Sequence, residues 1–389
     1  MTVSSARVSD GLVMVCDVDL AVPDATRVHT VEVARNFAAE GLAVDLVARG
    51  PDPEVDGVRY LQGQGADSQR VTRVATLNAG VLRLLWSRRM VAKRLYVRYR
   101  WSLMPVLIAG RLLGYRVVTQ VDDIPYGRGY QFEISPVADH VQRLGTTLMG
   151  RLARGVVAVT PELKRLLVEQ FHAPAQRIAV LPNGVDIDFF APQPRAEAIG
   201  RLGLDPSTRY VVFCGHFAPW VDFDTIIRGF GVVARNRPDV RLLLVGEGGE
   251  REQVERIIDE LGIRDRVIFT GYVSDRERVR DYVAASTVAL SANRYDYRAR
   301  IGVSPVKLAE YMAAARAVVA TELPGLRETL QANGAGVVVP IDPDAMGRAI
   351  LALLEGDRAD ELGARGRRLA EDSFSWRSIV RRTVPLFGL

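Results

Sequence analysis

Short apolar runs alternate with longer amphipathic segments along most of the 389-residue chain. Apolar runs of about four to eight residues bounded by turn residues are typical of buried strands, whereas apolar positions spaced three and four apart predict helices. Alternation of the two indicates parallel sheets with helical crossovers. In the first half, strands are expected at Leu12–Cys16, Val44–Val47, Arg94–Val97, Val117–Val121, Gly155–Val159 and Ile178–Leu181, and helices at Arg27–Glu40 and Leu103–Leu113.

The alternation restarts after a segment rich in turn residues, Pro182–Pro192, which is typical of an interdomain linker. A chain of this length also exceeds what one core usually serves, so we expect two domains divided near residue 190. We therefore predict an α/β protein made of two doubly wound, Rossmann-like halves. Strands of the second half are expected at Tyr210–Cys214, Arg241–Val245, Val267–Thr270, Val288–Ser291, Ala317–Ala320 and Gly336–Val339.

Composition sets limits on the class of protein. The hydrophobic fraction is 48% and the charged fraction 25%, and no apolar run is long enough to span a membrane. The first ten residues lack the basic-then-apolar pattern of a signal peptide. The two cysteines, Cys16 and Cys214, fall in predicted buried strands. We therefore expect a cytoplasmic protein without a cysteine metal site.

Positive charge is concentrated in one stretch of the chain. Between Asp67 and Asp122 there is no acidic residue, although the whole chain carries a net charge of only +5. Two interpretations stay open: a solvated helix face in an arginine-rich protein, or peripheral contact with an anionic membrane through residues 70–116. Nucleic acid is not expected, since no binding motif accompanies the charge. The eleven basic residues are Arg70, Arg73, Arg83, Arg88, Arg89, Lys93, Arg94, Arg98, Arg100, Arg111 and Arg116.

One predicted helix start has the chemistry of an anion site. Ser304 and Pro305 can cap and begin a helix, and Lys307 and Glu310 then follow on one face. Free N–H groups at such a start attract phosphate, and a lysine adds charge. The chain has three lysines against 48 arginines, so a retained lysine suggests that a compact ammonium is needed. The alternative is an amphipathic helix with a surface ion pair.

Several polar residues follow strands, where such folds bind ligands. His216 follows Gly215 and could contact phosphate or be structural. Asp122 and Asp123 could bind an acceptor or act as a weak base, or else cap a loop.

Two polar residues in the first part of the chain are weaker acceptor candidates. His29 lies near the start of the first helix, facing either a ligand or the core. Asp17 could meet an acceptor amine. The acidic pairs Asp17 with Asp19, and Asp122 with Asp123, also invite a metal interpretation, but we expect no required metal.

Five segments form a distinctive set when they are taken together: Leu181–Phe190, Val245–Gly248, Ile268–Tyr272, Pro305–Ala313 and Phe374–Trp376. In this order they resemble the characteristic blocks of glycosyltransferase family 4, the retaining enzymes with the GT-B fold. The resemblance covers nearly the whole chain and is clearest after Arg151. It implies two domains facing across a cleft, with residues 1–190 and the C-terminal helix 374–389 binding the acceptor and residues 191–373 binding the donor.

Matched to those blocks, individual residues acquire expected roles. Glu310 would hold the ribose of the donor, and the loop Gly302, Val303 and Ser304 would offer N–H groups to its sugar and diphosphate. The backbone near Tyr272 and Val273 would contact the base. The resemblance implies no cofactor beyond the nucleoside-diphosphate sugar, which is a co-substrate.

The chain also departs from the family pattern. The first glutamate of the family's pair is replaced by Gly302, and the basic pair expected near His216 and Val221 is missing. Lys307, with Arg294 and Arg298 in the adjoining loop, is the expected substitute for phosphate binding, and electrostatic stabilisation of the leaving diphosphate would make Lys307 catalytic.

The resulting expectation is a metal-independent retaining glycosyltransferase. It would use an atypical, modified sugar and a small acceptor of specialised metabolism such as antibiotic biosynthesis. The alternatives are a cell-envelope lipid or glycan acceptor, a GT-B epimerase or phosphorylase, and a non-catalytic nucleotide-sugar-binding protein. The base, the sugar, the acceptor and the oligomeric state do not follow from the sequence.

Overall fold

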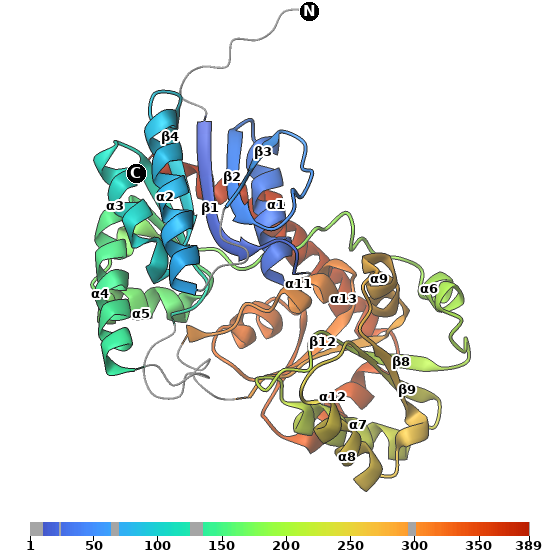
Figure 1. Ribbon diagram of the computed structural model, residues 1–389. Coiled ribbons are helices and arrows are strands. Elements are labelled where there is room, and N and C mark those ends of the chain that lie inside the picture. Colours follow the sequence, from blue (N-terminus) through green and yellow to red (C-terminus); the bar gives the residue numbers. More distant parts are fainter. Residues whose placement is uncertain (1–10, 23–24, 64–69, 125–134, 295–300, 389) are drawn as a thin grey trace, which may run out of the picture. The chain divides into compact units, whose positions relative to one another are not determined.

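The computed structural model describes residues 11–22, 25–63, 70–124, 135–294 and 301–388 (Figure 1). The chain forms two compact units. Unit 1 comprises Met1–Pro182 and Trp376–Leu389, and unit 2 comprises Asn183–Ser375. The division therefore lies at Pro182 rather than near residue 190, because the segment after Pro182 bonds to unit 2: the Val185 amide donates to the Phe374 carbonyl at 2.8 Å.

Unit 1 is built on a seven-stranded parallel sheet of order β3-β2-β1-β4-β5-β6-β7. Most of its strands are buried runs of valine, leucine and alanine, as expected where helices cover both faces. The strand order reverses between β1 and β4, which makes their carboxyl ends the place where such a sheet binds ligands. The strands are β1 (Gly11–Asp19), β2 (Ala43–Arg49), β3 (Val58–Gln62), β4 (Ala92–Arg98), β5 (Arg116–Val121), β6 (Gly155–Ala158) and β7 (Ile178–Val180).

Right-handed crossovers divide the helices of unit 1 between the two faces of this sheet. Helices α2 (Arg70–Arg88), α3 (Met104–Leu112), α4 (Pro136–Leu152) and α5 (Pro161–Phe171) pack successively on one face. Helix α1 (Ala25–Ala39) lies on the other face with the returning helix α14 (Trp376–Thr383). Short 3₁₀ turns are η1 (Trp101–Leu103), η2 (Ala175–Arg177) and η6 (Val384–Phe387).

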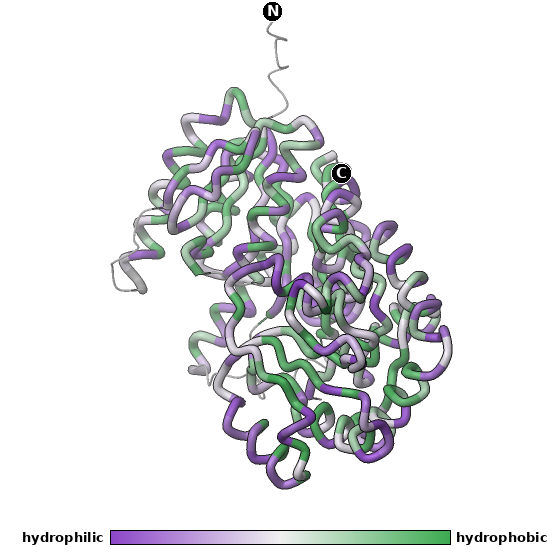
Figure 2. Tube along the Cα trace, turned by 90° about the vertical axis from the view of Figure 1, so that its right-hand side faces the viewer, coloured by the Kyte–Doolittle hydropathy of each residue, from purple (hydrophilic) through white to green (hydrophobic). Residues whose placement is uncertain are grey.

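Unit 2 repeats this plan with a six-stranded parallel sheet of order β10-β9-β8-β11-β12-β13. Along its helices the colouring of Figure 2 alternates between hydrophilic and hydrophobic, as expected for helices with one face on a sheet. The strands are β8 (Arg209–Cys214), β9 (Val240–Val245), β10 (Val267–Gly271), β11 (Val288–Ser291), β12 (Ala317–Thr321) and β13 (Gly336–Val339).

Within the described residues, the helices of unit 2 are shorter on average than those of unit 1. Those described are α6 (Arg195–Leu202), α7 (Phe223–Asn236), α8 (Arg251–Glu260), α9 (Arg276–Ala285), α11 (Val306–Ala313), α12 (Pro343–Leu353) and α13 (Arg358–Leu369). The remaining turns are η3 (Arg264–Arg266), η4 (Arg327–Gln331) and η5 (Ala370–Phe374). The predicted fold class, two Rossmann-like α/β halves with parallel sheets, is confirmed.

No helix among the described residues is both long enough and apolar enough to cross a membrane. The two cysteines are buried and unbridged. Burial raises the pKa of Cys16 to about 11 and that of Cys214 to about 12, so both thiols stay protonated and unreactive at neutral pH.

Removing the Trp376 side chain should destabilise unit 1, because it is a large buried side chain of α14 that packs against α1. Trp376 is 3% exposed and its ring meets His29 edge-on at 5.0 Å between ring centroids. Trp376→Ala should cost about 3–5 kcal/mol in free energy of unfolding. Urea unfolding followed by circular dichroism measures this, with Arg377→Ala as the control. A loss as small as that of the exposed Arg377 variant would contradict the packing role.

Candidate functional site

Three glycines shape the carboxyl end of the sheet in unit 2. Gly215 follows β8 and Gly246 follows β9, with φ of 145° and 137°, and Gly248 has φ of 156°. These are conformations that side-chain-bearing residues rarely adopt. A Cβ atom at Gly246 would overlap the Gly215 carbonyl oxygen, and one at Gly248 would lie 2.5 Å from the Phe217 carbonyl oxygen. Glycine is therefore required at Gly246 and Gly248 by close backbone packing.

Lys307 brings a cation to this glycine-lined edge. Its Nζ atom lies 4.0 Å from the centroid of the Phe213 ring, and a Cβ atom at Gly215 would lie only 2.8 Å from Nζ. Within the described residues no carboxylate lies within ion-pair distance of this ammonium. Burial lowers the pKa of Lys307 to about 8. An anion at this edge would supply the missing partner.

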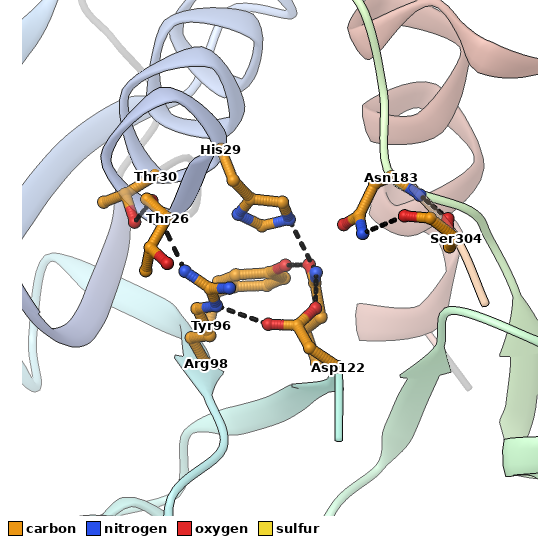
Figure 3. A network of polar contacts seen from close by, with 9 residues as sticks. Thr26, His29, Thr30, Tyr96, Arg98, Asp122, Asn183 and Ser304 are labelled. Carbon is orange, nitrogen blue, oxygen red and sulfur yellow. Dashed lines mark hydrogen bonds and ion pairs between the residues drawn. The ribbon is translucent and has the colours of Figure 1, made fainter. Parts of the chain in front are cut away.

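Helix α11 is held in place by hydrogen bonds just before its first residue and near its last residue. The Cys214 amide donates to the Tyr311 hydroxyl at 2.8 Å, which fixes the helix to the end of β8. The Asn183 amide donates to the Ser304 hydroxyl at 2.8 Å, and the Asn183 side chain donates to the Ser304 carbonyl at 2.9 Å (Figure 3). The expected capping role of Ser304 is wrong, because its hydroxyl is used by Asn183 and α11 begins one residue after Pro305.

Glu310 lies on the same helix, one turn after Lys307. Burial raises the pKa of Glu310 to about 7, although the positive charges of Arg276 and Lys307 act in the opposite direction. Around neutral pH the carboxyl group can therefore either accept or donate a hydrogen bond. Both roles suit a sugar diol, because each of its hydroxyl groups can donate and accept a hydrogen bond.

The remaining candidates in unit 2 lie on loops that follow strands. His216 is exposed, and its ring packs against Gly248. Tyr272 is 62% exposed after β10, with Val273 packed on the apolar core behind it. Gly302 has φ of 67°, a conformation that glycine adopts without strain.

Backbone donors are also available near the cation. Within the described residues, the N–H groups of His216, Val303 and Ser304 donate to no protein acceptor. Arg294 pairs with Glu250 at 3.4 Å, so it is not a free cation here. Arg298 lies outside the described residues. The site's described cation is therefore Lys307, supported by main-chain donors.

In unit 1 a buried polar network joins β4, β5 and α1 at the carboxyl end of the sheet (Figure 3). Arg98 at the end of β4 donates to Asp122 at 2.5 Å. The Gln120 side-chain amide donates to Asp122 and lies 2.6 Å from both Asp122 Oδ1 and His29 Nε2. The Tyr96 hydroxyl donates to the Gln120 oxygen. Each group of the Gln120 amide is thereby satisfied.

These contacts fix the protonation states in the network. Burial and the charge of Arg98 lower the pKa of His29 to about 3, so its ring is neutral. Burial alone would raise the pKa of Asp122, but the charge of Arg98 and the bond from Gln120 bring it down to about 2. Asp122 is thus ionised and ion-paired, which suits the positioning of a ligand better than removal of a proton.

The other candidates of unit 1 lie close by. Asp17 accepts from Arg49 at 3.1 Å, and Asp19 lies 3.4 Å from the same guanidinium. His29 is only 3% exposed and packs against Trp376, so a direct contact with an acceptor would require this histidine to become accessible. Asp123 follows Asp122 on the loop after β5 and is partly exposed.

Sequence reasoning missed four residues that organise the two sites. Tyr96 and Gln120 lie inside predicted strands and Arg98 directly follows one, and alternation of exposure gives no sign that their polar ends meet. Tyr311 falls on the predicted helix but looks like a core aromatic residue. Only Arg98 could have been found from the sequence. It is a charged residue at the end of one strand, and Asp122 and Asp123 follow the next strand along the chain.

No group of three or more histidine, cysteine or carboxylate side chains capable of holding a metal ion occurs in the part of the chain that the structure describes. The candidate site of unit 2 is instead a cation with backbone donors, which is a site for an anion.

Family models match both halves of the chain. The model described as Glycosyltransferase Family 4 matches residues 26–189, and the model described as Glycosyl transferases group 1 matches residues 208–356.

Two similar proteins have names that give their donor or acceptor. A GDP-mannose-dependent alpha-(1-6)-phosphatidylinositol monomannoside mannosyltransferase of Mycolicibacterium smegmatis is 30% identical over 60% of this chain and 62% of its own length. A D-inositol 3-phosphate glycosyltransferase of Nocardia farcinica is 32% identical over 57% of this chain and 49% of its own length. The matches therefore span about half to two thirds of these relatives.

Solved structures show the same fold at low identity. A sucrose-phosphate synthase of Thermosynechococcus elongatus superposes with a TM-score of 0.75 at 22% identity, covering 97% of this chain and 98% of that one. HepE of Anabaena, solved in complex with UDP-glucose, gives 0.72 at 18% identity, covering 97% and 100%. At such identity the likeness shows the fold alone.

Replacing Lys307 with methionine should not destabilise the ligand-free protein. The folded-state pKa, about 8, lies below the ordinary 10.5, so the ammonium form costs stability below pH 8 and this cost disappears as pH rises towards 10.5. At neutral pH, Lys307→Met should match the wild type or melt about 2–4 °C higher. The difference should narrow at about pH 10.

A thermal melt of the two proteins across pH tests this. The matched control is Lys164→Met, which loses the bond from Nζ to the Ile178 carbonyl at 2.9 Å and should melt lower. If Lys307→Met lost as much stability as Lys164→Met, the interpretation that the Lys307 ammonium lacks a stabilising partner among the described residues would be refuted.

Proposed function

This chain belongs to glycosyltransferase family 4, and from that premise we propose that it transfers a sugar, with retention of configuration, from a nucleoside-diphosphate sugar bound by unit 2 to an acceptor bound by unit 1. The observation that carries the proposal is the Lys307 ammonium. It lies at a glycine-lined strand edge, beside free main-chain donors and without a carboxylate partner among the described residues. Such an arrangement suits a diphosphate.

Each part of the donor then has a partner of matching chemistry. Lys307 and the N–H groups of His216, Val303 and Ser304 hold the diphosphate, and they neutralise the charge that grows on it as the bond to the sugar breaks. Glu310 binds the ribose hydroxyls. The exposed ring of Tyr272 lies next to the backbone that would contact the base.

We assign the reaction to a metal-independent mechanism without a further cofactor. Lys307 supplies the positive charge that a divalent cation supplies in other transferases, so a metal is not needed at the leaving group. The support is the chemistry of the described donors, which suit an anion rather than a cation.

The acceptor is assigned to the carboxyl end of the sheet in unit 1. Asp122, ionised and held by Arg98, and Asp17, held by Arg49, are rigid carboxylates that can accept bonds from acceptor hydroxyls or from an amine. We propose a small polyol-like or amino acceptor. A cell-envelope lipid acceptor is the second candidate, and it is favoured by the names of the relatives, one of which acts on a phosphatidylinositol mannoside and another of which is named for inositol phosphate.

The donor is proposed to carry a modified sugar. Gly302, in a left-handed conformation, presents no side chain where the family pattern has a glutamate that contacts sugar hydroxyls. A deoxy or amino sugar lacks one such hydroxyl and would not need that contact. An epimerase or phosphorylase would turn over without an acceptor, and a non-catalytic protein would not turn over at all.

Binding of a nucleoside diphosphate should stabilise the protein without metal. With EDTA present, one of UDP, GDP, dTDP, ADP and CDP at about a hundred times its Kd should add about 2.7 kcal/mol and raise the melting temperature by about 5–10 °C. Lys307→Met should lose most of this shift, whereas Lys164→Met should retain it. A complete lack of stabilisation by all five, or a strict need for magnesium, would contradict the proposal.

A donor panel tests the sugar. Transfer rates compared across UDP-glucose, GDP-mannose and deoxy- or amino-sugar nucleotides should favour a modified sugar by about tenfold or more in kcat/KM, since one missing hydroxyl contact is worth roughly 1–2 kcal/mol. Preference for UDP-glucose would overturn the assignment of the sugar while leaving the transferase assignment intact.

A further inference from the structure

Helix α4 exposes more large apolar side chains than it buries. Val137, Val141, Leu144 and Leu148 are all exposed, with Val137 at 74% and Leu144 at 64%. Their spacing of four, three and four places them on one face of the helix. The face against the rest of unit 1 consists instead of Gly145, Thr146, Met149 and Gly150. The usual arrangement of an amphipathic helix is therefore reversed, and its apolar face has no partner within the described residues.

The neighbouring helices continue this surface. On η1 and α3 the exposed apolar residues Trp101, Ile108 and Leu112 have the same kind of spacing, and Leu112 is 83% exposed. At the end of α2, Trp86 and Met90 are exposed one turn apart. Because α2 contacts α3 and α3 contacts α4, the three helices form one continuous layer on the same face of the sheet (Figure 1). We call the outward side of this layer the α2–α4 face.

The α2–α4 face is also strongly basic. Residues 68–121 contain no carboxylate, and Asp139, the acidic residue of α4, is bonded to Arg143 at 3.1 Å. The Arg89 guanidinium lies over the Trp86 ring, 3.9 Å from its centroid. Further exposed cations on or beside these helices are Arg83, Lys93, Arg100, Arg111, Arg116 and Arg151.

We propose that the α2–α4 face binds the surface of an anionic lipid bilayer. Apolar side chains on helices that lie flat can enter the boundary between headgroups and acyl chains, tryptophan favours that depth, and arginines reach the phosphates. A second copy of the chain is a poor occupant, because two faces rich in arginine and poor in carboxylates would repel each other. The inference goes beyond sugar transfer, and of the two candidate acceptors named above it favours the second, a cell-envelope lipid.

Vesicle binding tests the inference without using activity. The full chain is sedimented with vesicles of phosphatidylcholine alone or with about one third phosphatidylglycerol, at low and high salt. The wild type should bind the anionic vesicles at least about tenfold more tightly than the neutral ones, and salt should weaken this binding. Val141→Gln/Leu144→Gln and, separately, Arg83→Gln/Arg111→Gln should each lose about tenfold or more.

Matched controls lie in unit 2. Ile341→Gln removes an exposed apolar side chain and Arg358→Gln/Arg368→Gln removes two exposed arginines, and both should bind vesicles like the wild type. Equal binding to neutral and anionic vesicles, or unchanged binding by both α2–α4 variants, would overturn the proposal. The proposal would also be overturned if the wild type bound no vesicles and instead formed a dimer that the Val141→Gln/Leu144→Gln change dissociates. Nucleoside diphosphates should still stabilise these variants. If they do, a negative vesicle result counts against the membrane proposal alone and leaves the transferase assignment intact.

Discussion

An ammonium group that has no carboxylate partner among the described residues is the constraint on which the donor site depends. Lys307 rests on the Phe213 ring beside Gly215, and burial lowers its pKa to about 8. Such a group costs stability in the ligand-free protein, so the surrounding fold must hold it there. The bond between the Cys214 amide and the Tyr311 hydroxyl does so, since it fixes α11 to β8. Gly215 is a second condition, because any side chain at this position would meet the lysine.

In the buried polar network of unit 1, by contrast, the charged side chains have partners. There the charge of Asp122 is matched by Arg98, Gln120 satisfies Asp122 and Tyr96 together, and His29 is neutral. These bonds hold the network rigid, so that it adds little attraction for an ion but presents fixed acceptor atoms; among its described members, His29 Nδ1 is buried without a hydrogen-bond partner. This difference is the physical basis for assigning the anionic donor to unit 2 and a hydroxyl- or amine-bearing acceptor to unit 1.

The sequence alone predicts those features of the fold and of the site that depend on local sequence pattern or composition. Buried strands and their alternation with helices gave the two α/β units, and Lys307 stood out because lysine is rare in this chain. The contacts of Gln120 could not be predicted, because the pattern of a strand does not show which side chains of a neighbouring strand, or of the distant helix α1, it meets. The cap expected at Ser304 failed because a distant residue, Asn183, competes for the same hydroxyl. On α4, periodicity shows an apolar face but not which way it points, and glycines at the packed side allow the reversal.

The most direct measurement of the central claim is the dissociation constant of the preferred nucleoside diphosphate as a function of pH, by calorimetry. If the Lys307 ammonium binds the diphosphate, the wild-type Kd should be nearly constant around neutral pH and rise once pH exceeds about 8, where the free protein loses this proton. Lys307→Met should bind weakly without that rise. A wild-type Kd that is flat across this range, or one equal to that of Lys307→Met, would contradict the account.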